Sequence, residues 1–181
     1  VTWYPSIHTI SKNFQVLAPD IVGYGESDKP DAPYNRPYFS KWLKDFLKEL
    51  KISKAHIVGL SQGGAIALQF AIDNPEMVDK LVLVDAAGLG AKVSFWPLLG
   101  MIWMNSFPSS MASRFNSPYI LHKPTNRDPN HIGYSIDVLK SKGGKKAFKQ
   151  GRGTAVSKIP EELLKQIENE TLIIWGKDDK L

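Results

Sequence analysis

Residues 55–70 read AHIVGLSQGGAIALQF. The first part is a short apolar run, which predicts a buried strand over residues 55–60. The second part is rich in small residues, which predicts a helix after residue 61. Pro75, which follows five residues after the quoted stretch, cannot continue a helix and predicts its end. The stretch therefore predicts a strand that turns directly into a helix, with Ser61 at the junction.

Ser61 stands in a Gly-x-Ser-x-Gly pattern formed with Gly59 and Gly63. This pattern, between a strand and a helix, is typical of a nucleophilic serine on a sharp turn, because glycines remove side chains that would clash there. The start of a helix also offers free N–H groups and a positive dipole end to developing negative charge. The pattern predicts Ser61 as a nucleophile and the backbone N–H of Gln62 as an oxyanion donor. The alternative is an ordinary serine in a glycine-rich packing turn.

Further apolar runs lie on both sides of this stretch. Residues 14–18, 80–85 and 172–175 each predict a buried strand. Apolar residues at helical spacing over residues 37–50 predict an amphipathic helix, and Pro160 followed by two glutamates predicts the start of another. Strands that alternate with helices indicate an α/β fold, with a mostly parallel sheet covered by helices on both faces.

Residues 92–158 interrupt this alternation. They carry a run of large apolar side chains over residues 95–107, then loops rich in proline, serine and asparagine, then a lysine-rich segment over residues 140–152. We expect a helical cap inserted between the third and fourth strands. The core then consists of residues 1–91 and 159–181.

Composition excludes several classes of protein. The chain has 181 residues, of which 43% are hydrophobic and 23% charged, and it has no cysteine. These values are those of one globular domain and exclude disordered chains, disulfide frameworks and thiolate metal sites. No run of apolar residues is long enough for a transmembrane helix. The first residues lack the charged and apolar regions of a signal peptide, so we expect a cytoplasmic location.

The positive charge is concentrated in one segment. The net charge is +5, but residues 92–158 hold 11 lysines and arginines against two acidic residues. Such a segment is compatible with nucleic-acid binding. No recognition motif accompanies the charge, and lysine-rich faces are usually only solvated. We therefore expect no nucleic-acid partner.

Three blocks of the chain resemble α/β-hydrolases that carry a cap domain. They are residues 14–30, with a strand and the loop GYGESD, residues 55–70 around Ser61, and residues 171–179. The resemblance implies a triad of serine, acid and histidine in that chain order, with the acid just after the strand that follows the cap. The segment WGKDD, which ends at Asp179, fits the family pattern W-G-x-x-D. The resemblance therefore gives the acid role to Asp179, with the adjacent aspartate, Asp178, as second choice.

The same resemblance places the triad histidine downstream of the acid. All four histidines precede Asp179, and surface or packing roles are expected for them: His8, His56, His122 and His131. In the family, a second oxyanion donor comes from a loop upstream of the strand at residues 14–18. The family order also puts an earlier strand between that strand and the one at residues 55–60. We therefore expect this sequence to be part of a longer hydrolase and the 181-residue chain alone to be inactive.

The resemblance implies a serine hydrolase that acts on a carboxylic ester. Ser61 attacks the carbonyl, the histidine acts as base and then acid, Asp179 orients the histidine, and the N–H of Gln62 stabilises the oxyanion. No cofactor and no metal are expected. Two alternatives stay open. One is hydrolytic carbon–carbon cleavage of a ring-fission diketone, which residues 88–90 (GLG) favour. The other is a non-catalytic binding module on the same fold.

The substrate is expected to be a small molecule with an apolar acyl group. Ligands of such folds bind above the strand ends, where the cap lies. Large apolar side chains of the cap are the candidate contacts, namely Trp96, Leu99 and Trp103.

Overall fold

The computed structural model describes residues 3–90, 94–120, 129–151 and 153–179. Its centre is a parallel sheet with the strand order β1 (Ala55–Leu60), β2 (Val78–Val84), β3 (Glu170–Ile174). Leu60 pairs with Val84, and Val84 pairs with Ile174. The three strands therefore end at the same edge of the sheet, and the segments that follow them lie side by side.

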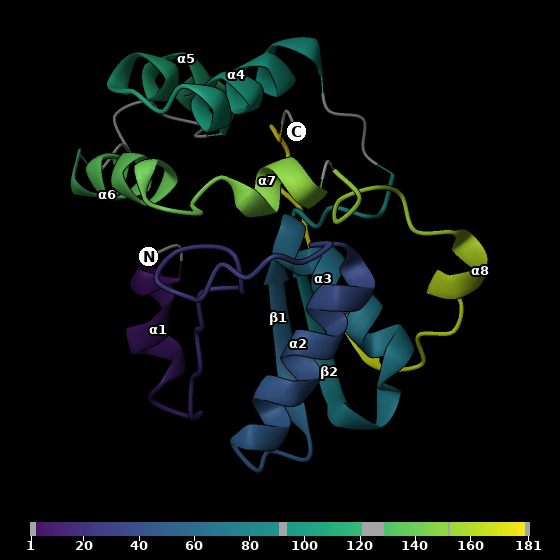
Figure 1. The fold of residues 1–181 in the computed structure, drawn as a ribbon. Helices are drawn as coiled ribbons and strands as arrows, with labels where there is room; N and C mark the ends of the chain where they lie inside the picture. Colours follow the sequence, from purple (N-terminus) through teal and green to yellow (C-terminus); the bar gives the residue numbers. More distant parts are fainter. Residues whose placement is uncertain (1–2, 91–93, 121–128, 152, 180–181) are drawn as a thin grey trace.

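The helices surround this sheet unevenly. In chain order they are α1 (Tyr4–Ile10), α2 (Arg36–Glu49), α3 (Gln62–Asp73), α4 (Phe95–Ser106), α5 (Ser110–Ile120), α6 (Pro129–Lys140), α7 (Lys146–Gly151) and α8 (Glu161–Leu164), with a 3-10 helix η1 (Pro75–Met77) before β2. Figure 1 shows α2 and α3 against the strands and α4 to α7 grouped above the end of β1. The predicted α/β class with a mostly parallel sheet and inserted helices is confirmed.

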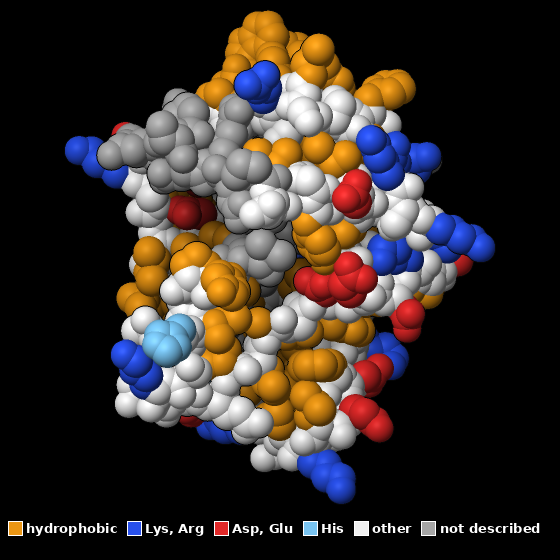
Figure 2. All heavy atoms as spheres, turned by 90° about the vertical axis from the view of Figure 1, so that its left-hand side faces the viewer, with side chains coloured by type: hydrophobic (Ala, Val, Ile, Leu, Met, Phe, Trp, Pro, Cys, Tyr) orange, Lys and Arg blue, Asp and Glu red, His pale blue; other side chains and the backbone are white. Residues whose placement is uncertain are grey.

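One face of the sheet carries the main core. Ile57 of β1, Leu81 of β2 and Phe70 of α3 belong to one cluster of buried side chains. Val58, which points to the opposite face, is 46% exposed. Figure 2 shows hydrophobic side chains at the surface on the side of the molecule where α1 and β1 lie. We expected helices on both faces of the sheet. Among the described residues, helices cover one face only.

The helix predicted over residues 37–50 is confirmed as α2. The side chain of Asn35 caps its start by accepting a hydrogen bond from the N–H of Tyr38 at 3.0 Å. Pro37 lies in the first turn, where a missing N–H costs nothing. Phe39 and Leu47 are buried, so the apolar stripe faces the core as its spacing requires.

The strand predicted over residues 14–18 is wrong. These residues form no strand, and Phe14 and Leu17 are 54% and 43% exposed. A strand needs a neighbour for its backbone hydrogen bonds, and among the described residues the sheet ends at β1. The ring of Phe14 instead packs against the ring of His56, with centroids 5.6 Å apart. The preceding helix α1 was not predicted, and none of its residues is buried.

Hydrogen bonds from α7 and from the segment after it connect the inserted helices to the core. The ammonium of Lys146 donates to the carbonyl oxygen of Lys29 at 3.0 Å. The guanidinium of Arg36 donates to the backbone oxygen of Ser157 at 2.5 Å and to its hydroxyl at 2.8 Å. The predicted boundary at residues 91 and 92 lies outside the described residues and stays a prediction. None of the helices in the described part of the chain is long and apolar enough to cross a membrane.

Candidate active site

Ser61 lies on the sharp turn between β1 and α3. Its backbone has φ 50° and ψ −118°, a region that non-glycine residues rarely adopt. Such a conformation costs on the order of 1–3 kcal/mol and persists only when the surroundings hold it. Its N–H donates to the oxygen of Val84 at 3.0 Å, and its own oxygen accepts from Ala87 at 3.0 Å and Gly64 at 2.9 Å. The side chain is exposed, so a strained and firmly held backbone presents the hydroxyl to solvent.

Two glycines make this turn possible. A Cβ atom at Gly59 would lie 2.4 Å from the backbone oxygen of Gly63, and a Cβ atom at Gly64 would lie 2.4 Å from the Cβ of Ala86. At Gly63 a Cβ would meet no atom within 4 Å. The steric role predicted for Gly59 is confirmed. The same role predicted for Gly63 is wrong and belongs to Gly64, because Gly64 is the residue that faces the segment after β2.

Gln62 is the first residue of α3, so its N–H has no acceptor inside the helix. Its side chain is anchored, since Nε2 donates to the hydroxyl of Tyr24 at 3.0 Å. Burial raises the pKa of Tyr24, and the hydrogen bond from Gln62 partly opposes that rise. The tyrosine therefore stays a neutral phenol at neutral pH. The expected role of the Gln62 N–H as an oxyanion donor stays a prediction.

The loop that carries Tyr24 is shaped by Asp20. One carboxylate oxygen of Asp20 accepts from the N–H of Glu26 at 2.8 Å, and its backbone oxygen accepts from the hydroxyl of Ser27 at 2.6 Å. Gly25 has φ 50°, and a Cβ there would lie 2.0 Å from that carboxylate. Asp20 therefore has a structural role, and it fixes the loop from which Tyr24 reaches the turn at Ser61.

We expect Tyr24→Phe to lower kcat for Ser61-dependent turnover by about fivefold, because it removes one neutral hydrogen bond, worth about 1 kcal/mol, that anchors Gln62, the predicted oxyanion donor. The measurement is steady-state hydrolysis of a chromogenic ester by the full-length protein. Tyr38→Phe is the matched control, since it makes the same change in α2, and it should leave kcat unchanged. Equal effects of the two variants would contradict the role of the Tyr24–Gln62 bond.

Asp178 and Asp179 lie in the turn after β3, at the same edge of the sheet as Ser61. The N–H of Asp179 donates to the oxygen of Gly176 at 3.1 Å, and both aspartates are exposed. Because β2 lies between β1 and β3, the two outer strands are about 10 Å apart. An acid after β3 is therefore too far from a serine after β1 for a direct hydrogen bond, and a third side chain would have to lie between them. The assignment of Asp179 as the acid stays a prediction.

The sequence predicts no role for Asp85 in the site. It follows β2 directly and is half-buried, and one of its carboxylate oxygens accepts from the N–H of Gly176 at 2.6 Å. The signal in the sequence was an acidic residue at the end of a predicted strand, with the segment WGKDD after the next strand. Only the pairing of β2 with β3 brings the two together.

The described histidine side chains do not lie beside Ser61. His56 is the second residue of β1, about 13 Å from the strand's other end. Its Nδ1 lies 3.2 Å from a carboxylate oxygen of Asp79. His8 is exposed on α1. His122 lies outside the described residues, and His131 is part of α6. The histidine of the expected triad therefore stays a prediction.

The three candidate substrate contacts lie on α4. Trp96 and Leu99 are exposed, whereas the ring of Trp103 packs against Phe115 of α5 with centroids 5.4 Å apart. The approach of the two helices is close, since a Cβ at Gly100 would lie 2.6 Å from the side-chain oxygen of Asn116. That these side chains contact a substrate stays a prediction.

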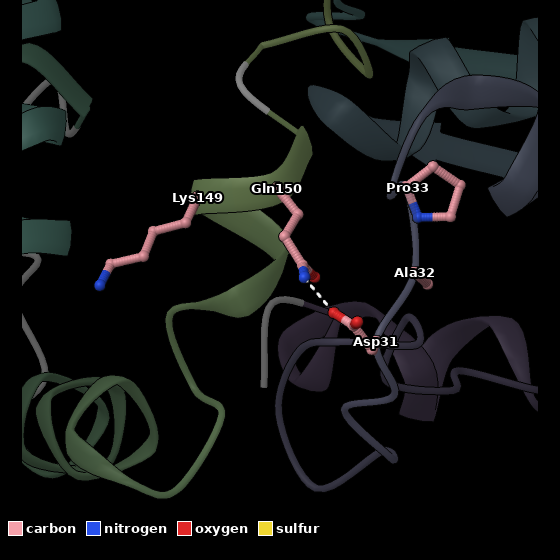
Figure 3. A pocket seen from close by; sticks show the side chains of 5 residues that line it. All are labelled: Asp31, Ala32, Pro33, Lys149 and Gln150. Carbon is pink, nitrogen blue, oxygen red and sulfur yellow. Dashed lines mark hydrogen bonds between the residues drawn. The ribbon is translucent and has the colours of Figure 1, made fainter.

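A hollow of about 590 Å³ lies elsewhere, between the loop before α2 and helix α7 (Figure 3). Its lining is mixed, and the amide of Gln150 donates across it to the carboxylate of Asp31. The lining residues are Asp31, Ala32, Pro33, Lys149 and Gln150. None of them belongs to the predicted site, so this hollow is a junction between the core and the inserted helices and not the expected acyl site.

Comparisons with known proteins agree with this arrangement. The chain is 30% identical over 182 residues to a poly(3-hydroxyalkanoate) depolymerase of Ectopseudomonas oleovorans, which covers 98% of the chain and 63% of that protein. It is 40% identical over 93 residues to a 2-hydroxymuconate semialdehyde hydrolase of Pseudomonas sp. strain CF600, covering 51% of the chain and 33% of that protein. A solved meta-cleavage product hydrolase of Pseudomonas fluorescens IP01 superposes with a TM-score of 0.85 at 28% identity, covering 99% of the chain and 67% of that structure.

The chain is shorter than these relatives, and matches to curated proteins cover between 31% and 63% of the length of the first ones found. A family model described as the alpha/beta hydrolase fold matches residues 1–125. The match includes β1, the turn at Ser61, α3 and β2. The chain therefore belongs to the α/β-hydrolase family.

Proposed function

We propose that this chain carries the nucleophile and the acid of a serine hydrolase that cleaves carboxylic esters. The observation that carries the proposal is the exposed Ser61 at φ 50°, held through both its backbone N–H and its backbone oxygen. Strained backbone of this kind concentrates at functional sites. The similarity over nearly the whole chain to a protein named as a poly(3-hydroxyalkanoate) depolymerase supports the ester as the first substrate class, because ester bonds join the units of such a polymer.

The proposed reaction is transfer of the acyl group to Ser61 followed by hydrolysis. The hydroxyl oxygen of Ser61 attacks the carbonyl carbon while a histidine takes its proton. The N–H of Gln62 donates to the oxyanion of the tetrahedral intermediate. The protonated histidine, oriented by Asp179, gives its proton to the leaving alcohol, and water then releases the acid from Ser61 by the same steps. The family order places that histidine downstream of Asp179.

A second candidate is hydrolysis of a carbon–carbon bond in a ring-fission diketone. Relatives named as a 2-hydroxymuconate semialdehyde hydrolase and a meta-cleavage product hydrolase favour it. Gly88 and Gly90 of the predicted GLG segment have φ 95° and 97°, so this segment needs glycine for its turn after β2.

One experiment decides between these functions. The full-length protein is given p-nitrophenyl esters of increasing acyl length and a ring-fission diketone, and kcat/KM is measured for each. Ser61-dependent turnover of esters supports the first proposal, and a higher kcat/KM for the diketone supports the second. Tight binding without turnover would support a binding module instead. We propose that the 181-residue chain alone is inactive, because neither described histidine side chain lies beside Ser61.

We expect Trp103→Ala to change the preference for acyl length by about tenfold in kcat/KM, because a pocket of large apolar side chains discriminates by the surface that it buries. The measurement is the ratio of kcat/KM for a long and a short acyl ester. Phe148→Ala is the control, since it removes an aromatic side chain from α7 and should leave the ratio unchanged. An unaltered ratio in Trp103→Ala would limit the role of Trp103 to its packing against Phe115.

A further inference from the structure

Asp85 occupies an unusual position between the two loops of the candidate site. It follows the last residue of β2, and its φ of 43° lies in the left-handed region, where a side chain is strained. Its N–H donates to the oxygen of Ile174 at 3.0 Å. Its carboxylate accepts from the N–H of Gly176 at 2.6 Å, across 91 residues of sequence. Asp85 thus bonds the last residue of β3 through its backbone and the segment after β3 through its side chain.

Val84 and Ala87, which lie near Asp85 in the sequence, make backbone hydrogen bonds to Ser61. The oxygen of Val84 accepts from the N–H of Ser61, and the N–H of Ala87 donates to the oxygen of Ser61, both at 3.0 Å. Residues 84–87 therefore bond the serine turn on one side and the segment after β3 on the other.

A further hydrogen bond connects Gly176 to Asp179, the proposed acid. The oxygen of Gly176 accepts from the N–H of Asp179 at 3.1 Å, which closes the turn that carries both aspartates. The carboxylate of Asp85 is thus two hydrogen bonds away from the backbone of Asp179. A hydrogen bond to an ionised carboxylate is shorter and roughly twice as strong as a neutral one.

We propose that Asp85 is a positioning residue that sets the turn of Asp179 relative to Ser61, an inference that rests on the proposed function. It needs no contact with the substrate. Errors of about 1 Å in the placement of reacting groups can lower turnover on the order of 100-fold. A glycine would adopt φ 43° without strain but offers no carboxylate, so the presence of aspartate at a strained position is explained by its bond to Gly176.

Two variants distinguish the contribution of the left-handed backbone at Asp85 from the contribution of its carboxylate. Asp85→Gly accepts the left-handed conformation but removes the acceptor, whereas Asp85→Asn keeps the shape and one acceptor oxygen but removes the charge. Asp79→Asn is the matched control, because it removes a carboxylate from the other end of β2, where Asp79 lies beside His56. All variants are made in the full-length protein.

The first measurement is hydrogen exchange of the backbone amides over residues 175–179. We expect Asp85→Gly to speed exchange at Gly176 by tenfold or more, on the scale of a lost hydrogen bond to a charged group, with Asp85→Asn intermediate. In Asp79→Asn, the exchange rate of the Gly176 amide should equal that of the unmodified protein. Unchanged exchange at Gly176 in both Asp85 variants would overturn the proposal, and Asp85→Asn decides alone where Asp85→Gly does not fold.

The second measurement is the split between kcat and KM in ester hydrolysis. We expect kcat to fall about 10- to 100-fold in Asp85→Gly, and several-fold in Asp85→Asn, with KM unchanged. Faster exchange with an unchanged kcat would overturn the positioning role. A protein without Ser61-dependent turnover would instead overturn the proposed function and the catalytic half of this inference, while exchange at Gly176 still decides the structural half.

Discussion

Ser61→Ala in the full-length protein is expected to lower kcat by about 10⁶-fold, the scale found when the nucleophile of a comparable triad is removed. The physical reason is that alanine keeps the Cβ and the backbone of the turn but has no oxygen to form the acyl intermediate. The measurements are ester turnover and covalent labelling by a serine-directed fluorophosphonate, both of which should be lost.

The control for this variant is Ser53→Ala, which removes an exposed hydroxyl from the turn before β1. It should keep full labelling and turnover. The melting temperature of Ser61→Ala should stay close to that of the unmodified protein, since the backbone strain at φ 50° is the same for both residues. Labelling that persists in Ser61→Ala would move the nucleophile to another side chain.

The serine turn could be predicted from the sequence because its causes are local. The apolar run of β1, the small residues of α3 and the stop at Pro75 lie within about twenty consecutive residues, and each element follows from its own stretch. The spacing of α2 is local in the same sense, and its cap at Asn35 lies next to it. Each of these elements can therefore be recognised from its own stretch, although β1 and the Ser61 turn also depend on hydrogen bonds to β2 and residues 84–87.

The strand expected over residues 14–18 failed because an apolar run does not specify a hydrogen-bonding neighbour. Its residues favour β structure, yet no described strand lies beside them, so the backbone remains irregular. The identity of the packing glycine failed for a related reason. Gly64 is required by its contact with Ala86, and that contact exists only because β1 and β2 are neighbours.

Asp85 shows the same limit within the candidate site. Its partner Gly176 is 91 residues away in the sequence, and the register of β2 with β3 brings them together. Sequence motifs indicate candidate residues whose neighbours in the sequence are diagnostic, such as Ser61 and Asp179. They do not indicate a residue such as Asp85, whose bond to Gly176 connects the segments after two neighbouring strands.

Asp179→Asn is expected to lower kcat by about 10⁴-fold, the scale found when the acid of a comparable triad is replaced by its amide. An amide cannot stabilise the protonated imidazole, and it favours the wrong tautomer of the histidine. KM should change little, because the proposed role of the carboxylate is to orient the histidine and not to contact the substrate.

Asp178→Asn is the matched control, since it makes the same change one residue earlier in the same exposed turn. It should lower kcat by less than tenfold, because we propose that Asp179 alone orients the histidine. Both variants should keep the Ser61 turn folded, which hydrogen exchange at the N–H groups of Ser61 and Ala87 would verify. If Asp178→Asn proved the more damaging change, the acid would be Asp178, and the bond between the N–H of Asp179 and Gly176 would serve to orient its neighbour instead.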